Sequence, residues 1–418
     1  MVLFAYAALA VISVRGKSVT SDEPLHLSSG WASLVLSDHR MITDNPPLVR
    51  RLAALPLLLL DVTFDPLEKA WKQANPWEWG LSFLFRQNDA ETLLAAGRLP
   101  ITALGVALGL AIFLWTRRLF GLPSAVLALV LFAFDPAMIA HGQLVTCDLG
   151  LTLFFFLTVA GFEYATARTT PATVLAAGLA LGGALAAKFS GVIALPVLAL
   201  LAPLARRRAA VTAGALAAML FTAWLVVWAA YGFHHDISSD PEVNAAFERT
   251  WPSAGGPLAE AVVAATRKLE ILPAPHLWGF LHAFNHGPRP AFLLGDRSDE
   301  GFWNFFPVTF LLKTPLYTLL LLGAALVFRP GRRSLRREAF LWLPPLVYLA
   351  ASMTQTMNIG LRHLLPVYPF VFVAAGRMAE FGRLLSVPLK ALLLVCPIAV
   401  CAFTYPNYLA SANVFAGG

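Results

Sequence analysis

Long apolar runs separated by shorter polar segments follow one another along almost the whole chain. A membrane-spanning helix needs about 20 mostly apolar residues, and several of these runs approach that length. The pattern therefore predicts an all-α polytopic membrane protein with about 11 transmembrane helices within residues 1–404. The runs lie at 2–14, 93–115, 122–134, 149–166, 172–187, 191–205, 210–230, 305–328, 339–353, 364–379 and 387–404.

Two polar intervals, 15–92 and 231–304, are much longer than the others and predict long loops on one side of the membrane. Inside the first interval, the apolar run 48–60 contains Arg50, Arg51 and Pro56. We therefore expect this run to form a helix that lies at the membrane surface and does not cross it. Tryptophans in both intervals suit the headgroup layer. The last segment, 405–418, is predicted to be a tail on the same side as these loops.

The composition agrees with this pattern. Hydrophobic residues make up 58% of the chain and charged residues 13%, whereas a soluble domain has roughly 25% charged residues. The three cysteines lie in or at the edges of apolar runs and lack the spacing of a metal site. A disulfide framework is therefore not expected.

Clusters of basic residues predict the orientation of the chain. Arg117-Arg118, Arg206-Arg207-Arg208 and the run Arg329–Arg337 fall in alternate loops, which places those loops in the cytoplasm. The long loops are then on the outer face, where acidic residues outnumber Lys and Arg and where all nine histidines fall. The net charge of +7 is thus an orientation signal, and no nucleic-acid partner is expected.

An acidic pair, Asp22-Glu23, follows the first apolar run on the outer face. Adjacent residues of an extended loop point in different directions, so these two carboxylates cannot face one bond as a hydrolase pair would. One of the two can act as a base while the other orients a donor or binds a cation. The alternative is a pair of solvated loop charges. The position of the pair at the end of a predicted span, ahead of His26 and Asn45-Pro46-Pro47, favours a functional role.

A second group of polar residues lies between two apolar runs, on the same predicted face. Asp135 precedes Pro136, as expected for a residue that caps a helix start. If 137–148 is one helix, His141 and Asp148 share a face, because they are seven residues apart. Asp148, His141 and His26 are therefore candidates for a second acidic or acceptor site.

Cationic side chains at the outer ends of apolar runs form the third group. An unpaired Lys or Arg in hydrocarbon costs at least about 2.5–3.5 kcal/mol. Several at one depth predict a site for an anionic headgroup, most simply a phosphate, although each could instead reach the interface by snorkelling. The candidates are Arg98, Lys188, Lys313, Arg362 and His363.

A metal site has little support in the sequence. His234-His235-Asp236 matches a metal-binding patch only loosely, because neighbouring histidines project apart. A solvated loop start is the favoured reading, and no set of metal ligands is predicted.

Four stretches of the chain resemble the GT-C superfamily of polyprenyl-phosphate-sugar-dependent glycosyltransferases. Within that superfamily they are similar to bacterial relatives of protein O-mannosyltransferases and aminoarabinose transferases. The stretches are Asp22-Glu23-Pro24-Leu25-His26 through Asn45-Pro46-Pro47-Leu48, Ala140-His141-Gly142 through Thr146-Cys147-Asp148, Phe302-Trp303-Asn304 through Lys313-Thr314-Pro315, and Asn358-Ile359-Gly360-Leu361-Arg362-His363 through Tyr368-Pro369.

The resemblance implies an inverting glycosyltransferase in the bacterial inner membrane, with its active site on the periplasmic face. The donor would be a polyprenyl-phosphate-linked sugar, and the acceptor a protein, lipid or glycan. Asp22 would be the catalytic base with Glu23 supporting it, Asp148 the second acidic residue, and Arg98 and Lys188 contacts of the donor phosphate. A divalent cation is left open as a cofactor. Relatives with the closing motif at 405–418 continue into an outer soluble region, and we expect this tail to be the start of one.

Two other functions remain open at this stage. A transporter or lipid flippase would also be polytopic, but it should have ionisable residues near the membrane midplane in several helices. In this chain the ionisable residues gather at one face. An oligosaccharide ligase of the same fold would transfer a whole glycan, and only its donor would distinguish it.

Overall fold

The structure, a computed structural model, describes residues 1–285, 287–328, 335–383 and 387–416. His286, most of the predicted cytoplasmic run Arg329–Arg337 and the end of the closing motif lie outside the described residues.

Each of the predicted apolar runs coincides with helical structure. These helices are α1 (Val2–Ser13), α6 (Ala90–Phe120), α7 (Leu122–Ala133), α9 (Asp148–Ala167), α10 (Pro171–Ala187), η2 (Phe189–Ile193), α11 (Ala194–Leu201), η3 (Ala202–Leu204), α12 (Ala209–Ala230), α16 (Phe305–Lys313), α17 (Leu316–Val327), α18 (Leu335–Met353), η4 (Leu361–Val367), α19 (Tyr368–Gly376), η5 (Arg377–Arg383) and α20 (Val387–Thr404).

Only some of these helices are long enough to cross a membrane by themselves. Among the described residues, four helical segments are both long and apolar enough: Ala90–Phe120, Asp148–Ala167, Ala209–Ala230 and Leu361–Phe381. α16 and α17 would form a fifth span, bent by 113° at Thr314-Pro315. The polytopic membrane fold is thus supported, but the predicted number of 11 spans is not confirmed.

The two long polar intervals are folded and carry their own short helices. The first contains α2 (Asp22–Val35), α3 (Leu48–Ala54), η1 (Leu55–Leu59), α4 (Lys69–Lys72) and α5 (Pro76–Phe85). The second contains α13 (Pro241–Phe247), α14 (Pro257–Lys268), α15 (Ala274–Phe284) and the strands β1 (Ala291–Leu293) and β2 (Asp296–Ser298). α8 (Pro136–His141) precedes α9, and η6 (Tyr408–Ala410) and η7 (Val414–Ala416) belong to the tail.

The small β-hairpin is the one departure from the predicted all-α class among the described residues. Its strands pair antiparallel, with Ala291 opposite Ser298 and Leu293 opposite Asp296.

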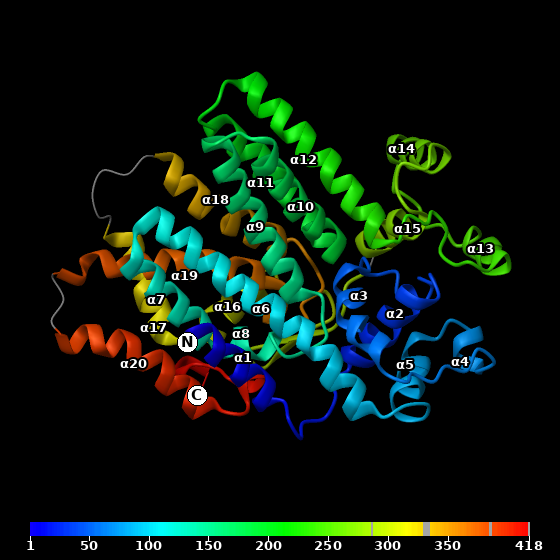
Figure 1. The fold of residues 1–418 in the computed structure, drawn as a ribbon, viewed down its shortest axis with the longest axis horizontal. Coiled ribbons are helices and arrows are strands. Elements are labelled where there is room, and N and C mark those ends of the chain that lie inside the picture. The colour runs from blue at the N-terminus through cyan, green and yellow to red at the C-terminus, as the bar shows by residue number, and fades with distance from the viewer. Residues whose placement is uncertain (286, 329–334, 384–386, 417–418) are drawn as a thin grey trace.

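Figure 1 shows the elements of both long loops together at one end of the helical bundle, which we call the loop end. The two loops bond directly to each other there. The His39 N–H donates to the carbonyl of Ile237 at 2.7 Å, and the Ser238 hydroxyl donates to Asp38 at 2.7 Å. The loop end is therefore a joint structure of both loops.

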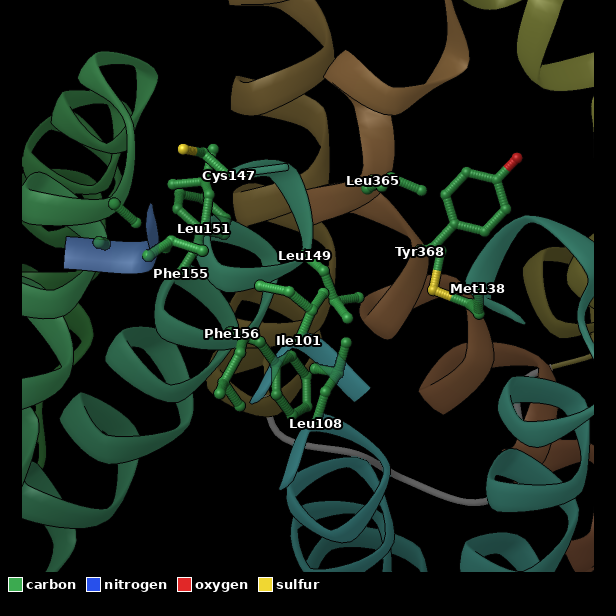
Figure 2. Packing of buried hydrophobic residues seen from close by; sticks show 14 of the residues in the cluster. Ile101, Leu108, Met138, Cys147, Leu149, Leu151, Phe155, Phe156, Leu365 and Tyr368 are labelled. Atoms are coloured by element: carbon green, nitrogen blue, oxygen red, sulfur yellow. The ribbon is translucent and has the colours of Figure 1, made fainter. Parts of the chain in front are cut away.

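The core lies around α9 and α19, and α12 lies at the edge. Of the most apolar 18-residue stretch in each helical segment, 72% is buried in α9, 83% in the segment that contains α19, and 28% in α12. Figure 2 shows core side chains from several helices packing together, among them Ile101, Leu108, Leu149, Phe155, Phe156, Leu365 and Tyr368. This packed interior supports the ends of α6 and α9 that reach the loop end.

Close packing of α10 against α12 depends on glycine. A Cβ at Gly178 would lie 3.1 Å from both the Cα and the carbonyl oxygen of Met219, and 2.7 Å from the Cβ of Thr222. Small residues allow this kind of close helix approach in membrane proteins.

We expect Gly178→Val to separate α10 from α12 and to lower stability by about 1–3 kcal/mol, the usual cost of overpacking. The matched control is Gly214→Val on α12, because a Cβ there meets no atom within 4 Å. Thermal unfolding in detergent should show a lower midpoint for Gly178→Val than for Gly214→Val. Equal midpoints would contradict the packing argument.

Candidate functional site

Asp22 and Glu23 form the first turn of α2 and do not lie in an extended loop, which corrects the conformation expected from the sequence. Carboxylates in a first turn interact favourably with the positive end of the helix dipole. Residues four apart on a helix share a face, so Asp22 and His26 point the same way. Adjacent residues still diverge, because each step turns by about 100°. Asp22 and Glu23 therefore have separate surroundings. The sequence also led us to expect that the two carboxylates diverge, but on the assumption of an extended loop.

Glu23 is fully buried and satisfied by three segments of the chain. Arg98 of α6 binds it with both Nε and Nη2, each 2.7 Å from one carboxylate oxygen. The backbone N–H groups of Val145 and Thr20 donate to the same carboxylate at 3.2 and 3.0 Å. Glu23 thus ties the start of α2 to α6 and to the segment before α9.

This pairing changes the expected role of Arg98. Arg98 was expected to contact a phosphate, but the structure pairs its Nε and Nη2 with Glu23. Arg98 is therefore placed to hold the site together.

Asp22 is a partly exposed carboxylate that is paired with a cation. Its side chain is 23% exposed and forms an ion pair with Nη1 of Arg362. Both charges act on His26, one turn further along α2. The first turn of α2 and the start of η4, far apart in the sequence, therefore meet at Asp22.

Asp148 is the second carboxylate of the group. It begins α9, and the ammonium of Lys188, at the end of α10, donates to it at 2.6 Å. His363 and Arg362 also act on Asp148 electrostatically, so the two carboxylates have Arg362 in common. The structure thus brings Asp22, Asp148, Lys188 and Arg362 into one cluster of alternating charge.

Three histidines border this cluster. His141 and His363 both interact electrostatically with Asp148 and Lys188, and His363 stacks on Phe306 at 6.4 Å between ring centroids. His26 is buried with its Nδ1 3.8 Å from the sulfur of Cys147. Burial lowers the pKa of both His26 and His141 to about 4, so both imidazoles are neutral at pH 7.

The segment 136–148 is not one continuous helix. α8 ends at His141 and α9 begins at Asp148, so the proposed seven-residue helical face does not form. His141 and Asp148 meet through the turn between the two helices. Asp135 caps α8 as predicted, because its side chain accepts a hydrogen bond from the N–H of Met138 at 3.0 Å.

Lys313 does not join the cluster. Its ammonium donates to the carbonyl oxygens of Ser411 and Ala410, at 2.9 and 3.4 Å. It therefore fastens the tail to the end of α16 and is not placed among the cations near Asp148.

Metal ligands are not gathered at this site. In the described part of the chain, no three His, Cys, Asp or Glu side chains are grouped so that they could hold a metal ion. Asp22 and Asp148 are instead paired with cations of the protein. The donor set does not fit a divalent cation, and we derive no step through one.

The comparisons with known proteins agree on the fold. A sequence profile described as dolichyl-phosphate-mannose-protein mannosyltransferase matches residues 90–231, about a third of the chain. ArnT from Cupriavidus metallidurans in the apo state is similar over 93% of this chain and 60% of its own, with 13% identity and a TM-score of 0.60. The apo oligosaccharyltransferase of Archaeoglobus fulgidus is similar over 98% of this chain and 55% of its own, with 15% identity and a TM-score of 0.56.

The chain has the fold of the GT-C glycosyltransferases. The comparisons thus agree with the fold that the resemblance implied. The chain spans only about 55–63% of the length of these solved relatives. No curated protein matches the chain significantly.

Several buried polar residues near the cluster were not among the predicted site residues: Arg50, His39 and His276. The sequence did place Arg50-Arg51 inside an apolar run, which could have indicated a buried cation. We instead expected a helix at the membrane surface to account for this pair.

We expect Glu23→Gln to lower the free energy of unfolding by about 3–5 kcal/mol, because it leaves the guanidinium of Arg98 buried without its charge partner. Glu91→Gln, at an exposed position near the start of α6, is the control. Equilibrium unfolding in mixed micelles measures both. A loss below about 0.5 kcal/mol for Glu23→Gln would show that the ion pair does not stabilise the fold.

The buried histidines predict acid sensitivity. An unfolded histidine takes up a proton near its usual pKa of about 6.5. In the folded chain, burial lowers the pKa of His26, His141 and His276 to about 4. Stability is therefore fully present above about pH 6.5 and falls as the pH drops toward 4, by up to about 1.4 kcal/mol per pH unit for each such group.

The thermal midpoint should fall between pH 7 and pH 5. His276→Phe should reduce this slope, whereas His234→Phe, at an exposed position, should leave it unchanged. A midpoint independent of pH would contradict neutral burial.

Proposed function

We propose that the chain is an inverting glycosyltransferase that moves a sugar from a polyprenyl-phosphate donor to a protein, lipid or glycan acceptor. The cluster of Asp22, Asp148, Lys188 and Arg362 at the loop end is the observation that carries this proposal. It offers one partly exposed carboxylate beside cations suited to a phosphate. The solved structures of ArnT bound to undecaprenyl phosphate and of archaeal AglB with a dolichol-phosphate, both with this fold, support the class of donor.

The reaction is a single displacement at the anomeric carbon. The acceptor oxygen or nitrogen attacks, its proton passes to the Asp22 carboxylate, and the bond from the anomeric carbon to the phosphate oxygen breaks. The electron pair leaves with polyprenyl phosphate, so the anomeric configuration inverts. A phosphate is a good leaving group, and cations that stabilise it are enough without a strong general acid.

Lys188 and Arg362 are the side chains we assign to the departing phosphate, with His363 beside them. Lys188 is paired with Asp148, and Arg362 with Asp22. A phosphate that draws Arg362 toward itself would therefore also release Asp22 to accept the proton. Glu23 and Arg98 act behind them by fixing the first turn of α2.

The orientation of the cluster follows from the basic loops. We place the loop end on the periplasmic face of a bacterial inner membrane, because Arg117-Arg118 and Arg206-Arg207-Arg208 lie in alternate loops, as cytoplasmic loops do.

A ligase that transfers a whole glycan is the second candidate, favoured by the similarity to the archaeal oligosaccharyltransferase. The two functions differ in the donor that is consumed, so assays with monosaccharide and oligosaccharide carriers separate them.

Asp22→Asn should reduce sugar transfer by at least about 100-fold, because it removes the proton acceptor but keeps the side-chain size. The assay measures transfer from a polyprenyl-phosphate-linked sugar by the full chain in lipid. Asp61→Asn, at an exposed site in the same loop, should keep normal turnover. Near-normal turnover by a folded Asp22→Asn variant would overturn the assignment of the base.

A further inference from the structure

Arg50 of α3 is a buried cation with no ion-pair partner among the described residues, although Asp44 acts on it electrostatically. It is 1% exposed, and its Nη1 donates to the carbonyl of Ile42 at 2.7 Å. Its Nε is buried with no hydrogen-bond partner, and no carboxylate of the described residues lies within ion-pair distance. Arg98 and Arg362, by contrast, each bind a carboxylate. A buried guanidinium left unpaired is costly, so Arg50 calls for an anion.

The groups around Arg50 also lack partners. Both ring nitrogens of His39 and the Nδ1 of His276 are buried and unbonded. Tyr231 lies between these imidazoles, with ring centroids 4.9 Å from His39 and 5.7 Å from His276. Native proteins leave few buried polar atoms unpaired, so four such atoms in one place indicate a missing ligand.

Both imidazoles are neutral in this setting. Burial holds the pKa of His39 well below its usual range and lowers that of His276 to about 4. A neutral imidazole still has one N–H to donate. Arg50 and the two histidines can therefore offer several N–H donors from different directions, which suits a tetrahedral oxyanion.

These unpaired groups adjoin the cluster of Asp22, Asp148, Lys188 and Arg362 on one side and the second long loop on the other. On one side, Arg50 acts electrostatically on His26 and Cys147. On the other, His39 and Arg51 adjoin His234. His234 lines an open hollow of about 450 Å³, together with Ser37, His235, Asp236, Ser238, Ser239, Pro241 and Asn244.

We propose that Arg50, His39 and His276 bind a phosphate group of the acceptor, which reaches them from this hollow and presents its nucleophile to Asp22. The proposal rests on the transferase function above and adds the chemical class of the acceptor. The donor phosphate is assigned to Lys188 and Arg362, across His26 and Cys147 from Arg50. Two hydrogen bonds of 2.7 Å join segment 38–39, which includes His39, to segment 237–238, which includes Ser238 of the hollow.

Binding of inorganic phosphate to the full chain in lipid nanodiscs tests the proposal, with and without saturating undecaprenyl phosphate. Wild-type protein should bind inorganic phosphate in both cases. Arg50→Gln should weaken this binding at least about tenfold, the effect of losing a charge-assisted hydrogen bond. The same variant should keep its affinity for undecaprenyl phosphate within about twofold. The matched control, Arg249→Gln in the second long loop, should bind both ligands as wild type does.

Two results would overturn the proposal. If undecaprenyl phosphate displaces inorganic phosphate, and Arg50→Gln also weakens the binding of undecaprenyl phosphate, then Arg50, His39 and His276 bind the donor and not the acceptor. If neither Arg50→Gln nor His276→Asn changes phosphate binding, the unpaired groups hold water only.

The design also covers a variant that does not fold. If Arg50→Gln unfolds, Arg50→Lys and His276→Asn take its place, and each should weaken phosphate binding at least threefold. Asp22→Asn should bind inorganic phosphate normally even though it loses sugar transfer. Transfer assays therefore test the transferase function, and phosphate binding tests the acceptor site separately.

Discussion

The buried ion pair between Glu23 and Arg98 is the constraint on which the loop end depends. Two parallel hydrogen bonds of 2.7 Å join the first turn of α2 to α6, and the N–H of Val145 adds the segment that leads into α9. A bidentate pair of this kind fixes direction as well as distance. Asp22 is the neighbour of Glu23 on the same turn, so the position of the proposed base follows from a pair that does not itself take part in the reaction.

Charge balance distinguishes the two groups of cations at the loop end. Arg98, Lys188 and Arg362 each have a carboxylate partner, and together they form a nearly neutral cluster. Such a cluster can exchange partners when a charged substrate arrives without leaving a bare charge behind. Arg50 has no such partner among the described residues and is held by one carbonyl. The two environments therefore suit different tasks: stabilising charge that develops during a reaction, and holding an anion that is already present.

The members of the charged cluster could be singled out from the sequence because ionisable residues are rare in this chain. Only 13% of the residues are charged, so Asp22, Asp148, Lys188 and Arg362 stood out at the ends of apolar runs. Lys313 stood out equally, but it bonds the carbonyls of the tail, and no local pattern distinguishes these outcomes. Arg98 was predicted to contact a phosphate, and its pairing with Glu23 was not foreseen, since a sequence does not show which carboxylate a cation meets. His39 and His276 were missed because each lies in a polar loop where a histidine is unremarkable until the fold buries it.

The sequence by itself determined the membrane class, the apolar segments and the concentration of acids and histidines in the long loops, because these depend on local composition and on the cost of charge in hydrocarbon. It also indicated the superfamily, since the motifs at 22–48, 140–148 and 358–369 are local patterns. Only the tertiary structure decided which charges pair, that α8 and α9 break between His141 and Asp148, and that Arg50 forms no ion pair with a described carboxylate. Pairing depends on distances between segments far apart in the chain. Those distances are set by helix packing and by the Glu23–Arg98 pair together, not by any single stretch of residues.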